Sequence, residues 1–126
     1  MRRLLDTNAV LYLLGGRLAA PLPPGEYLIS VITEMELLSY PSLDSRSEKQ
    51  ITDFLTEVAV IGLTRDVEER AIQLRQQEHL KLPDAIVAAT ALVFDAELLT
   101  NDKKLHRVQG LKLRELAVRE NPLGSS

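Results

Sequence analysis

The sequence contains no cysteine and no tryptophan, and aromatic residues make up only 4% of its 126 residues. Without cysteine, disulfides and thiolate metal sites are excluded, and the composition is compatible with a reducing compartment. The few aromatic side chains are expected to pack in the core rather than stack on nucleic-acid bases; they include Tyr12, Tyr40, Phe54 and Phe94. Any metal site in this chain must therefore use oxygen or nitrogen ligands.

The sequence also lacks a long apolar run. The longest nearly uninterrupted one, residues 85–94, is about half as long as a bilayer-spanning helix must be. The first predicted strand begins within a few residues of Met1, which leaves no room for a signal peptide. We therefore expect a cytoplasmic protein without a membrane span.

A strong charge of one sign is missing as well. The formal net charge is −3, with 15 basic and 18 acidic residues. The field of the whole molecule therefore does not favour nucleic acid, and a polyanionic partner would have to be held by a local basic patch or through a metal ion.

The length and composition are those of one ordinary globular domain, with 45% hydrophobic and 26% charged residues. A chain of this size buries about two thirds of its unfolded surface around a single core. We expect the domain to comprise residues 1–122. Residues 123–126 form a small polar tail that could be of artificial origin.

Apolar strand-like and helical patterns alternate along the chain. Strands are predicted at 3–5, 26–30, 58–63, 97–100 and 111–116, and helices at 8–14, 31–40, 45–57, 64–80 and 84–94, with a short helix or turn at 101–108. The helix at 45–57 begins with a candidate capping box, Ser45 and Glu48. This alternation predicts βαβ units and a mostly parallel sheet covered by helices on both faces.

Acidic side chains follow the predicted strands. Asp6 follows the first strand, Glu36 lies about one helical turn beyond the second, and Asp102 follows the strand at 97–100. Asp84 opens the most apolar helix. Because ligands of parallel α/β sheets gather at the carboxyl ends of the strands, this topology directs the acids toward one edge.

Each acid alone has a simpler explanation as a helix cap. Asp6, Asp84 and Asp102 could be N-caps, and Glu36 could be the N3 acid of a capping box that begins at Thr33. Four acids in one pocket, however, would repel one another unless some bound protons or a cation compensated their charge. An oxygen-only cluster suits a hard divalent ion, Mg²⁺ or Mn²⁺.

Four segments, "LLDTN", "ISVITEMELL", "LPDAIVAATAL" and "LLTNDKKL", occur in this order along the chain. With them the sequence resembles PIN-domain ribonucleases, and within that family the VapC-type toxins of toxin–antitoxin pairs. The resemblance implies a three-layer α/β/α PIN-like fold with a small, mostly parallel central sheet. It assigns the catalytic and metal-binding acids to Asp6, Glu36, Asp84 and Asp102, and supporting roles to Thr7, Asn8 and Thr100. Lys104-Leu105 stands where many relatives have Asp-Phe.

The resemblance further implies a metal-dependent endoribonuclease that cuts single-stranded RNA and leaves a 5′-phosphate and a 3′-hydroxyl. It also implies a cognate antitoxin protein and a homodimer as partners. Basic residues flank the first and the last acid of the tetrad: Arg2, Lys103, Lys104 and Arg107. They either contact the RNA phosphates or form a solvated surface.

Three other functions are alternatives to a nuclease. A haloacid-dehalogenase-type phosphatase requires a second Asp where Asn8 stands, and a response-regulator receiver requires an Asp where the central strand ends in Gly62-Leu63. The third alternative is a PIN-like module that binds a protein or RNA partner without catalysis. The complete set of four acids favours the nuclease.

Overall fold

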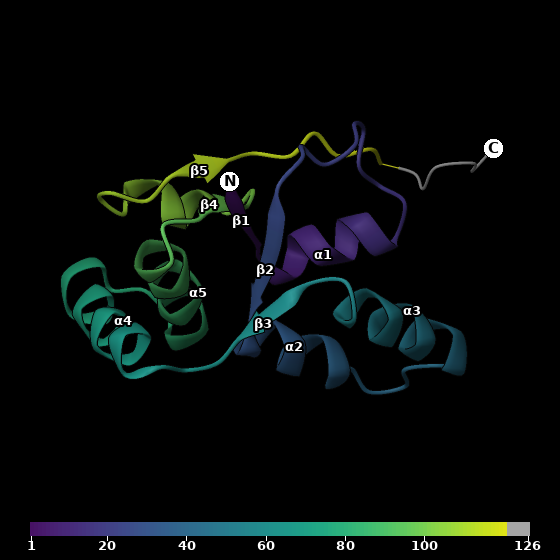
Figure 1. Ribbon diagram of the computed structural model, residues 1–126, viewed down its shortest axis with the longest axis horizontal. Helices are drawn as coiled ribbons and strands as arrows, with labels where there is room; N and C mark the ends of the chain where they lie inside the picture. Colours follow the sequence, from purple (N-terminus) through teal and green to yellow (C-terminus); the bar gives the residue numbers. More distant parts are fainter. Residues whose placement is uncertain (121–126) are drawn as a thin grey trace.

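The computed structural model describes residues 1–120 (Figure 1). In chain order the elements are β1 (Arg2–Leu5), α1 (Thr7–Leu14), β2 (Glu26–Ser30), α2 (Val31–Leu38), α3 (Ser45–Leu55), β3 (Ala59–Ile61), α4 (Arg65–Glu78), α5 (Leu82–Val93), β4 (Glu97–Leu99), the 3₁₀ helix η1 (Lys103–Arg107) and β5 (Leu113–Arg114). The predicted domain end at residue 122 and the tail at 123–126 lie outside the described residues. The predicted alternation of strands and helices is confirmed.

The five strands form one parallel sheet in the order β3-β2-β1-β4-β5. The chain starts at β1, adds β2 and β3 on one side, and then returns to add β4 and β5 on the other. The strand order therefore reverses at β1, and a parallel α/β sheet forms its ligand crevice outside the carboxyl ends at such a point. The residue that follows β1 is Asp6.

Helices cover both faces of the sheet, as predicted. Leu4 and Leu98 pack with α4 and α5, whereas their neighbours Leu5 and Leu99 pack with α1 and α3 on the other face. Adjacent strand residues face opposite sides because side chains alternate along a strand. Figure 1 shows α4 and α5 on one side of the sheet and α1 and α3 on the other. This is the predicted three-layer α/β/α architecture.

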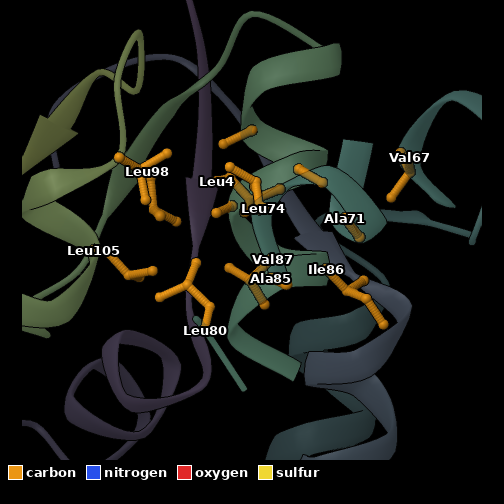
Figure 2. Close-up of a cluster of buried hydrophobic side chains, with 14 of the residues drawn as sticks. Leu4, Val67, Ala71, Leu74, Leu80, Ala85, Ile86, Val87, Leu98 and Leu105 are labelled. Carbon is orange, nitrogen blue, oxygen red and sulfur yellow. The ribbon is translucent and has the colours of Figure 1, made fainter. Parts of the chain in front are cut away.

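The most apolar helix, α5, is also the most buried. Residues 85–91 are all shielded from solvent, since α5 lies between the sheet and α4. Figure 2 shows Ala85, Ile86 and Val87 of α5 in one apolar cluster with Leu74 of α4. Within residues 1–120, no helix is both long and apolar enough to cross a bilayer.

Three predicted details were wrong. Helix α3 is capped by Asp44, which accepts from the Ser47 backbone N–H at 2.7 Å, so Ser45 does not begin a capping box. Ile72 was expected on the apolar side of α4 but is half exposed. Helix α5 begins at Leu82 rather than at Asp84, because proline is tolerated in the first turn of a helix and Pro83 does not interrupt it.

Candidate active site

Asp6 is fixed at the junction of β1 and α1. Its backbone N–H donates to Leu99 O at 3.3 Å, which ties it to the neighbouring strand β4. Its carboxylate Oδ1 accepts from the Ala9 N–H at 2.7 Å and so caps α1. The capping explanation is therefore confirmed for Asp6, but it accounts for only one of the two carboxylate oxygens.

Thr100 connects Asp6 with Asp102. Its side chain is fully buried, and its hydroxyl donates to Asp6 Oδ2. The same hydroxyl oxygen accepts from the Asp102 backbone N–H at 3.0 Å. A buried hydroxyl that uses both its donor and its acceptor in this way fixes the positions of the two acids relative to each other.

Glu36 belongs to α2, one helical turn from the end of β2. The Thr7 hydroxyl donates to Glu36 Oε1 at 2.7 Å and also lies 3.1 Å from the Thr33 hydroxyl. Helix α2 is capped by Ser30, which accepts from the Ile32 N–H at 3.1 Å. The capping-box explanation for Glu36 was therefore wrong, since this residue lies well inside the helix.

Asp84 is the third residue of α5. The N-cap position is Lys81, whose side chain makes no capping hydrogen bond. Asp84 is therefore not the N-cap, as the capping explanation would require. Its side chain is about two thirds buried, at 30% exposure, and as an acid in the first turn of α5 it interacts favourably with the amino end of that helix.

Asp102 caps a helix with one carboxylate oxygen, while its other oxygen faces a charged side chain. Its Oδ1 accepts from the Lys104 backbone N–H at 3.0 Å and caps η1. Its Oδ2 faces the Lys104 ammonium, with 3.9 Å between Oδ2 and Nζ. The next residue back, Asn101, bonds the backbone of Leu116 through both its amide oxygen and its amide nitrogen, which fixes the loop after β4.

All four acids line a single cavity of about 170 Å³ at the carboxyl ends of the strands. One water needs only about 15 Å³ of such volume, so the cavity can admit a hydrated ion together with part of a ligand. Its lining is Asp6, Thr7, Asn8, Glu36, Tyr40, Pro83, Asp84, Val87, Asp102 and Leu105. Residues from distant parts of the chain therefore meet as the topology predicts.

The acids influence one another electrostatically. Burial raises the pKa of Asp6, and the charges of Asp102 and Asp84 raise it further, against the hydrogen bonds from Thr100 and Ala9. Burial also raises the pKa of Asp84, and the charges of Asp102 and Glu36 act in the same direction, opposed by Lys104. The cavity thus disfavours carboxylate charge, as expected for a site that a cation completes.

The donor set fits a hard divalent ion, because four carboxylates offer only oxygen ligands. Asp6, Glu36, Asp84 and Asp102 would hold such an ion. In the side-chain positions of the structure, no three His, Asp or Glu groups within residues 1–120 are close enough together to hold one ion. For three of the acids to hold one ion together, their carboxylates would have to draw closer.

The predicted supporting residues lie at the site, but only some of the predicted RNA-contact residues do. Thr7 and Asn8 line the cavity, and Thr100 lies beneath it. Lys103 and Lys104 lie on η1 beside the cavity. Arg107 is also on η1, and its guanidinium donates to Glu78 O at 2.8 Å.

The structure does not bring Arg2 to the cavity. This residue is at the amino end of β1 and donates to Phe94 O at 3.1 Å. It stands four positions before Asp6, so at about 3.3 Å per strand residue the two lie at opposite ends of the strand.

Tyr40 was missed as a cavity residue. It was expected in the core, but it is 45% exposed and lines the cavity. Its position at the end of α2, next to Pro41, could have indicated that the chain turns there toward the carboxyl edge. Three other aromatic residues that were expected in the core are more enclosed: Phe54 is buried, Phe94 packs at the edge of the core, and Tyr12 lies under Arg17.

Comparison with known proteins places this fold and site in a class. The model of the PIN domain family matches residues 3–111. This chain therefore belongs to the PIN domain family, whose members are generally nucleases that use divalent metal ions. No curated protein sequence matches the chain.

Solved structures point to one branch of the family. A chain of a toxin–antitoxin complex from Klebsiella pneumoniae is 34% identical, with a TM-score of 0.75, over 86% of this chain and 94% of that one. VapBC2 from Rickettsia felis, bound to a promoter DNA fragment, gives a TM-score of 0.79 at 20% identity, over 93% of this chain and all of that one. DNA-bound VapBC from Salmonella typhimurium gives 0.78 at 20% identity, over 91% and 98%. The predicted resemblance to VapC-type toxins is confirmed.

Proposed function

We propose that this chain is a Mg²⁺- or Mn²⁺-dependent endoribonuclease that hydrolyses single-stranded RNA. The observation that supports this most directly is the meeting of Asp6, Glu36, Asp84 and Asp102 in one cavity at the point where the strand order reverses. Glu36 and Asp84 do not act as helix caps. Two acids that share the cavity and cap no helix favour a function in the site itself.

Different residues of the chain would have different roles in RNA hydrolysis. A bound divalent ion would polarise a phosphoryl oxygen and make water more acidic. Thr100 and Thr7 hold Asp6 and Glu36 in orientation through their hydroxyl groups. The Glu36 and Asp84 carboxylates, which cap no helix, would orient the attacking water. Lys103, on the exposed side of η1, would meet the phosphates of the RNA.

We further propose that the protein acts as the toxin of a toxin–antitoxin pair, as a homodimer in the cytoplasm, with a small antitoxin encoded beside it. The toxin–antitoxin complex from Klebsiella pneumoniae supports this assignment because its matching chain exceeds 30% identity over most of both chains. The adjacent reading frame offers a simple check: a short protein with a DNA-binding N-terminus would agree with the toxin function.

The catalytic assignment is tested by Asp6→Asn. Asparagine also caps helices, so α1 should remain intact. We expect the purified variant to lose metal-dependent cleavage of single-stranded RNA and, if the wild type inhibits growth, to lose that effect too. Undiminished cleavage by the variant would refute the assignment.

A matched pair on α2 separates site acids from ordinary surface acids. Glu36 lines the cavity, whereas Glu34, on the same helix, does not. We expect Glu36→Gln to lose cleavage and Glu34→Gln to retain it. If the wild type is inert on RNA with either ion, the alternative of a PIN-like binding module without catalysis is favoured.

A further inference from the structure

Lys104 places an ammonium group against two of the site acids. Its Nζ lies 3.8 Å from Asp84 Oδ2 and 3.9 Å from Asp102 Oδ2. Among the described residues, it provides the only Lys, Arg or His nitrogen within 4.0 Å of any of the four acids. The charge of the cavity is therefore partly balanced by a group that belongs to the chain itself.

The contact is one of charge rather than a fixed hydrogen bond. Both distances exceed the 3.2 Å or so that limits an ordinary N–H···O bond. The Lys104 side chain is 56% exposed, so its ammonium group has access to solvent. An ammonium held in this way can give up its position to a competing cation.

The shape of η1 does not depend on the Lys104 side chain. Asp102 caps η1 through the backbone N–H of Lys104, and any residue other than proline provides that group. The apolar contact of η1 with the core comes from Leu105, which is buried. The distinct contribution of the Lys104 side chain at this site is its positive charge.

We propose that Lys104 is a built-in counter-ion of Asp84 and Asp102, which a divalent cation must displace in order to bind. The inference rests on the proposed function, since it assumes that these acids bind such an ion. It accounts for the geometry of the site, in which one ammonium lies 3.8 Å from Asp84 Oδ2 and 3.9 Å from Asp102 Oδ2. Lys104 thereby sets the divalent concentration at which the site fills.

The test is calorimetric titration of the full chain with Mn²⁺, with three variants beside the wild type. Lys104→Met removes the charge and keeps the backbone donor that Asp102 uses. Lys104→Arg keeps the charge, and Lys103→Met removes the neighbouring charge. Since each exposed ion pair is worth up to about 1 kcal/mol and Lys104 makes two, we expect Lys104→Met to bind Mn²⁺ about tenfold more tightly.

Lys104→Arg and Lys103→Met should bind Mn²⁺ about as the wild type does. Equal or weaker binding by Lys104→Met would overturn the inference while leaving the metal site in place. Equal tightening by Lys103→Met would overturn it too, because the effect would then be one of net charge. If neither the wild type nor Lys104→Met takes up Mn²⁺, the metal site itself fails and the inference fails with it.

A second measurement is thermal melting without and with the metal. In EDTA, Lys104→Met should melt at a lower temperature than the wild type, because Asp84 and Asp102 lose the only ammonium within 4.0 Å of them among the described residues. With saturating Mn²⁺ its melting temperature should rise by more than that of the wild type. Identical melting in both conditions would contradict a counter-ion role.

Discussion

The two ends of the parallel sheet arrange charge in opposite ways. At the amino end, Arg3 of β1 and Glu97 of β4 form an ion pair, with side chains only 9% and 13% exposed. Arg114 donates to the same Glu97 carboxylate at 2.8 Å, and Arg3 donates to Pro24 O at 3.0 Å. Each buried charge at this end therefore faces a charge of the opposite sign.

At the carboxyl end, the same two strands lead into acids. Asp6 follows β1 and Asp102 follows the end of β4, and they share the cavity with Glu36 and Asp84. One ammonium, that of Lys104, lies within 4.0 Å of two of these four carboxylates, those of Asp84 and Asp102. The balanced end is explained by stability alone. At the unbalanced end, burial and neighbouring like charges raise the pKa of Asp6 and Asp84, which favours a cation that the site binds.

The largest expected effect comes from removing the buried ion pair at the amino end of the sheet. Arg3→Met should lower the free energy of unfolding by about 3 kcal/mol, because it leaves the buried Glu97 carboxylate with fewer partners. Urea denaturation measures this change. The control is Arg2→Met, in which an exposed side chain is lost at the same end, with an expected change within about 1 kcal/mol. If both variants were equally stable, the amino end would not be held by its ion pair.

The next largest effect concerns a hydroxyl group that holds the acids in position at the carboxyl end of the sheet. Thr100→Val removes the buried hydroxyl that links Asp6 to Asp102, and should weaken Mn²⁺ binding by about 10- to 100-fold. The matched control is Thr90→Val, whose buried hydroxyl donates to Ile86 O within α5. Calorimetry on both variants separates positioning of the acids from a general effect of losing a buried hydroxyl. A loss of the same size in both would contradict a positioning role for Thr100.

A smaller effect tests whether the unbalanced acids strain the metal-free protein. Asp84→Asn removes one like charge from the cavity, and should raise the free energy of unfolding in EDTA by roughly 0.5–1 kcal/mol at neutral pH. The same variant should lose cleavage. Asp95→Asn, at an exposed acid paired with Lys112, provides the control and should not stabilise the protein. A destabilised Asp84→Asn protein would show that this carboxylate has a structural role after all.

The smallest effect is a pH dependence. In the folded state the pKa of Asp84 lies above its ordinary value of 3.8, so folding disfavours its charged form. The resulting loss of stability is absent below the unfolded-state pKa and fully present above the raised folded-state pKa. The melting-temperature gap between Asp84→Asn and the wild type in EDTA should therefore narrow as the pH falls from neutral toward about 4. A gap that widened on acidification would reverse the sign of the proposed shift.

The meeting of the acids could be predicted because it depends on topology. Parallel strands end at the same edge, so Asp6 and Asp102, each placed just after a strand, had to come near each other. The sequence could not decide whether each acid was only a cap, since that depends on where a helix starts. The observed starts of α2 at Val31 and of α5 at Leu82 removed the capping explanation for Glu36 and Asp84.

The positions of the long basic side chains were predicted less well than the positions of the acids that follow the strands. Arg2 precedes Asp6 closely in sequence, but an extended strand carries it to the opposite edge of the sheet. Lys104 was predicted only as a candidate phosphate contact, and its approach to Asp84 joins two segments 20 residues apart along the chain. Such contacts depend on how η1 packs beside α5. The local sequence pattern does not specify that packing.

The most direct test of the account is a calorimetric titration of the free protein with Mn²⁺, compared with Asp6→Asn and Asp84→Asn. If the acidic end is completed by a cation, the wild type releases or absorbs heat as it takes up the ion, and each variant does so much more weakly. No uptake by the wild type, or uptake that both substitutions leave unchanged, would contradict the central claim.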